Sequence, residues 1–286
     1  MTNVFTVNGL RYRYPRAPKE ALKGLDFEVR EGEIFGLLGP SGAGKSTAQK
    51  ILTKLLEDYQ GSIRCFGEDL RNIGRAYYER IGVGFEMPVH FTKLTAMENL
   101  RFFRGFYKKP ADIETLLTRV GLWEHRDIRV GEYSKGMKVR LNFVRAMINS
   151  PRILFLDEVT NGLDPANARI IKEMIAQFRQ DGGTVFLTTH LMSDVEQLCD
   201  RVAFCVEGRL AEVSTPRELK LRYGTREVTL EYREAEGLTR RSFPMAGIGD
   251  NEGFLKVIKE KELETLHSGE TSMEEIFIRV TGVKEV

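Results

Sequence analysis

Short apolar segments alternate with longer amphipathic ones between residue 34 and about residue 213. Apolar runs of strand length occur at residues 34–38, 81–85, 153–157, 184–188 and 202–206, and several lack a polar face, as do strands that are covered on both sides. Helical periodicity begins near Lys45, Thr95, Lys135 and Pro165, with Asp164 as the expected N-cap of the last helix. The alternation predicts an α/β fold, with a mainly parallel sheet.

The pattern changes towards both ends of the chain. Residues 4–7, 11–14 and 27–30 predict short strands of an N-terminal antiparallel β layer. Beyond Pro216, residues 227–233 alternate as a strand, residues 254–259 are amphipathic, and Thr271 with Glu274 forms a capping-box pattern before a last short helix. We therefore expect a large domain at 1–222, with a helical subdomain at about 87–150, and a small α+β domain at 223–286.

Composition and charge narrow the classes of function. The chain has 286 residues, of which 42% are hydrophobic and 29% charged, which is ordinary for a globular protein. Its 43 basic and 41 acidic residues leave a net charge of +2, too small to favour a nucleic-acid partner. The sequence has no secretion-signal pattern and no apolar run near the ~18 residues of a membrane helix. We expect a cytoplasmic protein.

The three cysteines are Cys65, Cys199 and Cys205. They are odd in number, widely spaced and surrounded by apolar residues, which predicts buried thiols in a reducing compartment. A metal site at Cys199 and Cys205 is the less favoured alternative, because no further cysteine or histidine follows at ligand spacing.

The apolar run at 34–38 leads into a glycine-rich motif for phosphate. Its residues are Gly39-Pro40-Ser41-Gly42-Ala43-Gly44-Lys45-Ser46-Thr47, which match the phosphate-loop pattern between a strand and a helix. In such a loop the backbone N–H groups and the helix N-terminus face phosphate oxygens. We expect Lys45 to neutralise the β- and γ-phosphates of ATP and Ser46 to bind Mg²⁺. A glycine-rich turn without a ligand is the alternative.

Two adjacent carboxylates end the apolar run at 153–157. Successive side chains of a strand point in different directions, so Asp157 is expected to face Mg²⁺ while Glu158 orients the attacking water as general base. Two acids at a strand end are often only solvated, but the phosphate loop in the same chain makes that alternative weaker.

Three further motifs resemble the ABC ATPase family over about residues 4–222. Tyr133-Ser134-Lys135-Gly136-Met137 is similar to its signature motif, although only the serine and the second glycine match the usual Leu-Ser-Gly-Gly-Gln. Asn161-Gly162-Leu163-Asp164-Pro165 resembles the family's D-loop, and Thr188-Thr189-His190 resembles its switch histidine. These motifs stand in the family's order.

The resemblance implies roles for individual residues. Ser134 and Gly136 would contact nucleotide held by a second subunit, and His190 would contact the γ-phosphate. Tyr14 would stack on adenine; Tyr12 is a competitor, and a packing tyrosine is the alternative. The family usually has a glutamine where this chain has Glu86, which would keep a Mg²⁺-facing role but bring negative charge near the γ-phosphate.

The resemblance also implies partners. One phosphate loop and one signature motif per chain imply a head-to-tail pair with a second ATPase subunit, identical or related. The pair would dock on integral membrane permease subunits at the cytoplasmic face of the cell membrane, and aromatic residues at 91–107 would form a groove for a short permease helix. The signature variant and residues 272–282 resemble ATPases of ABC-2-type exporters. A soluble ABC clamp and a small-molecule kinase are the competing functions.

Overall fold

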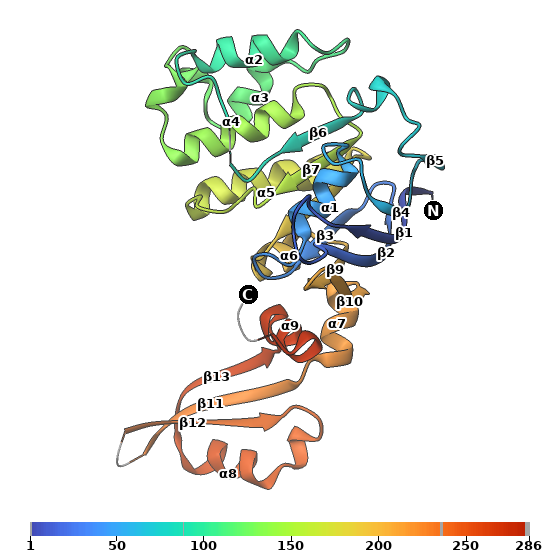
Figure 1. Ribbon diagram of the computed structural model, residues 1–286. Coiled ribbons are helices and arrows are strands. Elements are labelled where there is room, and N and C mark those ends of the chain that lie inside the picture. Colours follow the sequence, from blue (N-terminus) through green and yellow to red (C-terminus); the bar gives the residue numbers. More distant parts are fainter. Residues whose placement is uncertain (1, 88, 235–236, 284–286) are drawn as a thin grey trace. The chain divides into compact units, whose positions relative to one another are not determined.

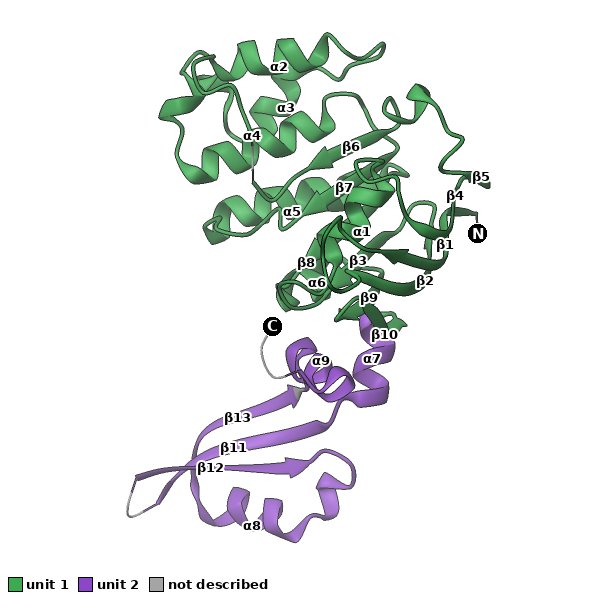
Figure 2. Ribbon diagram, in the orientation of Figure 1, with its two compact units in different colours: residues 1–215, 285–286 green, residues 216–284 purple. Residues whose placement is uncertain are grey.

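The computed structural model describes residues 2–87, 89–234 and 237–283. It divides into two compact units, the first ending at Thr215 and the second beginning at Pro216 (Figure 2). The expected boundary lay after residue 222. The helix α7 (Pro216–Tyr223) instead belongs to the second unit, because it packs against α9 (Met273–Thr281) of that unit.

A six-stranded sheet forms the centre of the first unit. Its order is β10-β9-β3-β8-β7-β6, and all strands except β10 run parallel. The strands are β3 (Ile34–Leu38), β6 (Ile81–Gly84), β7 (Ile153–Asp157), β8 (Thr184–Thr189), β9 (Arg201–Val206) and β10 (Arg209–Ser214). The apolar runs of the sequence therefore form strands buried on both faces, and the expected α/β class is confirmed.

An antiparallel sheet of order β2-β1-β4-β5 covers part of this unit. Its strands are β1 (Asn3–Tyr12), β2 (Leu22–Arg30), β4 (Gln60–Cys65) and β5 (Glu68–Asp69). The two strands expected at 4–7 and 11–14 are one strand. The register of β1 against β2 shifts between Val7 and Leu10, where Gly9 has a φ of 60°. A bulge at this position lets β1 continue as one strand, although its hydrophobic pattern is interrupted there.

Aromatic side chains fill the core between the two sheets. Phe27 stacks on Phe35 with ring centroids 5.5 Å apart, and Phe35 stacks on Phe186 at 5.9 Å. Phe5 of β1 reaches Phe155 of β7 at 5.8 Å. This packing joins the antiparallel layer to the central strands of the parallel sheet.

Helices flank the parallel sheet and form a subdomain beside its β6 edge (Figure 1). The subdomain contains α2 (Ala96–Arg104), α3 (Ile113–Arg119) and α4 (Lys135–Met147), and the other helices of this unit are α1 (Lys45–Leu52), α5 (Pro165–Gln180) and α6 (Met192–Leu198). Short 3-10 turns lie at Arg75–Tyr77, Trp123–His125 and Val130–Glu132. Asp164 caps α5 through the amide of Asn167, as expected from the sequence.

The second unit has its own sheet and its own core. The antiparallel strands β11 (Arg226–Glu234), β12 (Gly237–Pro244) and β13 (Glu262–Glu270) have the order β12-β11-β13. A 3-10 turn (Ile248–Asp250) precedes α8 (Glu252–Glu260), which covers one sheet face. One core cluster of this unit contains Val228, Leu230, Tyr232, Phe243 and Val257.

The last helix begins one residue later than expected. Ser272 caps α9, and Glu275, not Glu274, completes the capping box. Thr271 is unavailable as the cap because its hydroxyl accepts from the Thr225 amide and donates to the Thr225 carbonyl.

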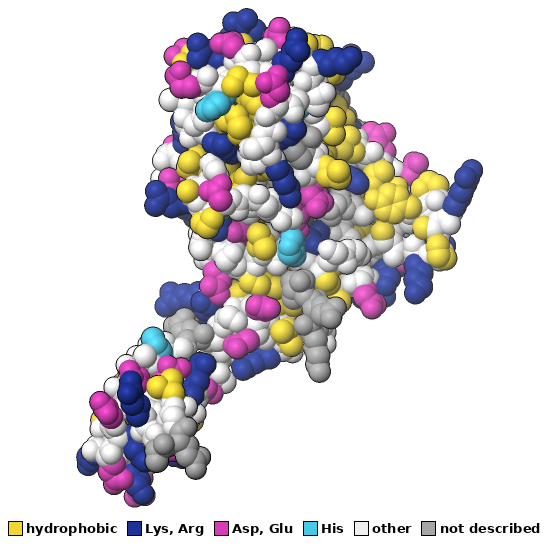
Figure 3. Space-filling model, turned by 90° about the vertical axis from the view of Figure 1, so that its left-hand side faces the viewer, with side chains coloured by type: hydrophobic (Ala, Val, Ile, Leu, Met, Phe, Trp, Pro, Cys, Tyr) yellow, Lys and Arg dark blue, Asp and Glu magenta, His cyan; other side chains and the backbone are white. Residues whose placement is uncertain are grey.

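Two surface properties bear on the partners. Among the described residues, no helix is both long and apolar enough to cross a bilayer. On the face drawn in Figure 3, basic and acidic side chains are interspersed.

Candidate nucleotide site

The phosphate loop connects β3 to α1, and its glycines are required by space and backbone conformation. A Cβ at residue 39 would lie 2.0 Å from the backbone oxygen of Cys205, and Gly44 has a φ of 106°. The helix α1 begins with no side-chain cap and no acidic residue in its first turn. Its amide groups are therefore suited to bind an anion such as a phosphate.

Lys45 is buried at the centre of this loop. Its Nζ donates to the carbonyl oxygens of Gly39 at 2.6 Å and Pro40 at 3.1 Å, and lies 4.0 Å from Glu158 Oε1. Burial lowers the pKa of the Lys45 ammonium, although the Glu158 and Asp157 carboxylates act in the opposite direction. The loop thus holds a cation beside the end of β7.

The two carboxylates after β7 are both buried and have different partners. Asp157 Oδ1 accepts a short hydrogen bond from Thr188 Oγ1. Glu158 has a φ of 50°, which turns its side chain away from the strand direction, and its Oε1 lies 2.8 Å from His190 Nδ1. Asp157, Glu158, His190 and Lys45 therefore meet at the ends of adjacent strands.

Two residues to which the sequence analysis gave no role of their own, Gln49 and Thr189, support this cluster. Gln49 is buried in α1, and its Oε1 lies 3.2 Å from Thr188 Oγ1. Thr189 Oγ1 lies 3.4 Å from Glu158 Oε2 and accepts from the Leu191 amide. The detectable signal was chemical: the threonine hydroxyls stand at the end of β8, a strand buried on both faces where apolar residues are expected. Gln49 lies on α1 and gave no comparable signal.

Tyr14 lies beside the phosphate loop, whereas Tyr12 belongs to the core. Tyr14 is half-buried, and its hydroxyl lies 3.1 Å from Thr47 Oγ1. Tyr12 is only 6% exposed and packs edge-on against the Tyr14 ring. Tyr14 is thus the better placed of the two tyrosines for a planar base.

Glu86 is exposed in the loop after β6. Burial lowers the pKa of the Lys45 ammonium, and the Glu86 carboxylate, like those of Glu158 and Asp157, acts in the opposite direction. The carboxylate is therefore electrostatically coupled to the phosphate loop, though it makes no described hydrogen bond with it.

Ser134 and Gly136 are not brought to the phosphate loop of their own chain in the described structure. Ser134 is exposed and caps α4 by accepting from the Met137 amide at 3.2 Å. Gly136 lies against Leu163, and Gly162 lies against the Lys135 side chain. The signature motif therefore packs against the 161–164 segment and leaves the N-terminus of α4 exposed.

The described residues hold no cluster of three or more His, Cys, Asp or Glu side chains suited to a metal ion. Ser46 and Asp157 can provide a hydroxyl and a carboxylate, which fits Mg²⁺ because this ion usually keeps water and phosphate ligands.

Cys205 is buried, its thiol donates to the Ala43 carbonyl, and burial raises its pKa to about 11. This thiol packs behind the phosphate loop.

Comparison with known proteins places this geometry in a family. The ABC transporter family model matches residues 22–161, and the model of the fluoroquinolone efflux ABC transporter C-terminal domain matches residues 226–270. A fluoroquinolones export ATP-binding protein of Mycobacterium tuberculosis is 50% identical over 283 residues, which cover 98% of this chain and 94% of that protein. A Nod factor export ATP-binding protein I of Burkholderia thailandensis is 39% identical over 206 residues, covering 70% and 68%.

A solved structure agrees with these relatives. The ATP-binding subunit of an ABC transporter superposes with a TM-score of 0.70 at 27% identity, covering 77% of this chain and 93% of that one. The resemblance first seen in the signature, D-loop and histidine motifs is confirmed. The mycobacterial relative is 50% identical over 98% of this chain. The chain therefore belongs to the ABC ATPases that serve as ATP-binding subunits of ABC transporters.

Proposed function

We propose that this ATPase powers export through ABC-2-type membrane subunits by closing, together with a second ATPase subunit, over bound ATP. The carrying observation is the convergence of Lys45, Asp157, Glu158 and His190 at the strand ends, with the phosphate loop beside them. The names of the mycobacterial and Nod factor relatives support export. The cargo would be handled by the membrane subunits.

The residues of the cluster divide the chemistry of hydrolysis. Glu158 orients and deprotonates the attacking water, and His190, which lies 2.8 Å from Glu158, positions that carboxylate and contacts the γ-phosphate. Lys45 exchanges the Gly39 and Pro40 carbonyls for phosphate oxygens. Ser46 and Asp157 would hold Mg²⁺, which would supply charge neutralisation on the phosphates. Tyr14 stacks on the adenine.

The exposed signature motif supports the pairing of two subunits. Ser134 and the N-terminus of α4 offer a hydroxyl and amide groups for phosphate, yet they lie against the 161–164 segment of their own chain. A second subunit placed head to tail brings these groups to the other chain's nucleotide. The pair then works as a peripheral assembly on the cytoplasmic face of the cell membrane.

The test compares the purified wild type with Glu158→Gln in Mg²⁺-dependent ATP hydrolysis and in sedimentation with and without ATP. Loss of the base should lower kcat by at least about a hundredfold while ATP binding persists, so the variant should accumulate as an ATP-dependent dimer. Glu173→Gln, which removes the same charge from an exposed position on α5, should match the wild type. A Glu158→Gln protein that hydrolyses ATP normally and stays monomeric with ATP would contradict the proposal.

A further inference from the structure

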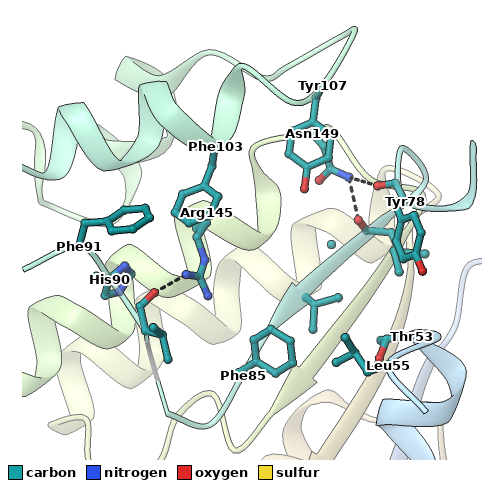
Figure 4. A pocket seen from close by; sticks show the side chains of 14 residues that line it. Thr53, Leu55, Tyr78, Phe85, His90, Phe91, Phe103, Tyr107, Arg145 and Asn149 are labelled. Carbon is teal, nitrogen blue, oxygen red and sulfur yellow. Dashed lines mark hydrogen bonds between the residues drawn. The ribbon is translucent and has the colours of Figure 1, made fainter. Parts of the chain in front are cut away.

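Two further regions of the first unit bring side chains together outside the nucleotide site. One is a hollow of about 430 Å³ between the β6 edge of the sheet and the helical subdomain (Figure 4). Its lining includes Phe91 and Phe103, so it lies where the resemblance places the helix of a membrane subunit. The other is a buried ion pair between α5 and α6, which the proposed mechanism of hydrolysis leaves without a role.

This pair joins Asp194 of α6 to Lys172 of α5. Asp194 is only 2% exposed, and Lys172 Nζ lies 2.6 Å from its Oδ1 and also donates to Gln197 Oε1 at 2.9 Å. The other carboxylate oxygen, Oδ2, accepts a short hydrogen bond from Thr160 Oγ1, which is buried as well. Both oxygens of the carboxylate therefore have donors, as a charge removed from water requires.

The segments joined by this carboxylate carry two residues of the candidate nucleotide site. Thr160 follows Glu158 by two residues in the loop after β7, where the Asn161 amide donates to the Glu158 carbonyl at 3.0 Å. Asp194 follows His190 by four residues, in the first turn of the helix after β8. The hydrogen bond between Thr160 and Asp194 therefore closes a ring that contains Glu158 and His190.

The direct links between these two segments are more open to disturbance. Thr189 Oγ1 and the His190 amide each lie 3.4 Å from Glu158 Oε2, near the upper limit for a hydrogen bond. The His190 side chain is 31% exposed, so water can compete for its contact with Glu158. The bond between Thr160 and Asp194 is buried, and hydrogen bonds are electrostatically stronger in a low dielectric. It is therefore the firmer tether.

We propose that Asp194 is a positioning residue for ATP hydrolysis. Its hydrogen bond with Thr160 holds the segment after Glu158 against the helix after His190, and Lys172 orients the carboxylate by binding its other oxygen. The inference rests on the proposed function, in which Glu158 is the base and His190 its partner. Small displacements of a reacting group lower the rate steeply, so loss of the tether should act on kcat and leave KM nearly unchanged.

The test removes the Thr160 hydroxyl at nearly constant volume. Thr160→Val should lower kcat on the order of tenfold, while the KM for MgATP and the binding of ATP stay close to those of the wild type. Thr160→Ser keeps a hydroxyl, and Asp194→Asn can still hydrogen-bond to the Thr160 hydroxyl, so both should retain most of the rate. Steady-state and single-turnover ATPase assays measure these effects.

Thr184→Val is the matched control. Thr184 is equally buried, but it lies at the opposite end of β8, where its hydroxyl accepts from the Gly32 amide at 2.9 Å. This variant should lose thermal stability to a similar extent yet keep the kcat of the wild type. Equal losses of kcat in the two valine variants, or no loss in Thr160→Val, would overturn the proposal.

A double-variant cycle separates this inference from the proposed function. In a Glu158→Gln background, Thr160→Val should cause little further loss of the residual hydrolysis, because the tether acts through the Glu158 carboxylate. The same tenfold loss in both backgrounds would show that the Thr160 hydroxyl acts independently of Glu158 and would contradict the inference alone. Hydrolysis by Glu158→Gln at the rate of the wild type would instead remove the proposed function, and the inference with it.

Discussion

At the scale of single residues, buried contacts decide what each polar side chain near the phosphate loop can do. Glu158 and Asp157 are neighbours in the sequence, yet His190 and Thr188 hold them in different directions. The left-handed backbone of Glu158 makes this divergence possible. A strand pattern predicts two directions, but it does not predict which hydroxyl or imidazole holds each acid.

Glu86 gives a prediction at this scale. Its charge acts on Lys45 from an exposed loop position, so it also repels a nucleotide's phosphates, weakly because solvent screens it. Glu86→Gln should therefore lower the KM for MgATP by roughly two- to threefold. Steady-state ATPase assays at low and high salt measure this, since screening should shrink the difference.

Glu124→Gln, an exposed acid in the helical subdomain, provides the control for net charge. An unchanged KM in Glu86→Gln would contradict the predicted repulsion. A raised KM would support the Mg²⁺-facing role that the resemblance implies for Glu86.

At the scale of elements, the sequence predicts features that depend on neighbouring residues, but it does not predict the pairing register of β1 or the exact start of α9. The phosphate loop, the buried strands and the Asp164 cap depend on neighbours within a few residues, so the sequence predicts them. The bulge at Gly9 and the one-residue shift of the last capping box depend on partners far along the chain, namely β2 and Thr225. Likewise, nothing adjacent to Gln49 indicates its contact with Thr188 of β8.

The cap of α9 gives a prediction at this scale. Ser272→Ala removes the acceptor of the Glu275 amide and should lower the free energy of unfolding of the second unit by about 1 kcal/mol. Urea denaturation measures the change. Ser268→Ala makes the same substitution within β13, away from any cap, and should have a smaller effect. Equal losses would show that the capping box contributes nothing particular.

At the scale of the whole molecule, the two units have separate hydrophobic cores. Every residue proposed to touch nucleotide lies in the first unit. Ligand binding should therefore stabilise the first unit and leave the second unchanged, because a ligand stabilises only the cooperative unit that binds it.

Scanning calorimetry tests this expectation. A non-hydrolysable ATP analogue at a hundred times its Kd should stabilise one of two transitions by roughly 2.7 kcal/mol. Ser272→Ala should lower the other transition, which assigns it to the second unit. A single transition that responds to both changes would contradict independent folding.

The close approach of Gly39 to the Cys205 backbone limits how the phosphate loop can vary during evolution. The obstacle to a side chain at residue 39 is a peptide oxygen, which every amino acid at residue 205 would present in the same place. No substitution at residue 205 removes that oxygen, so a larger residue at 39 would require the backbone of β9 itself to shift.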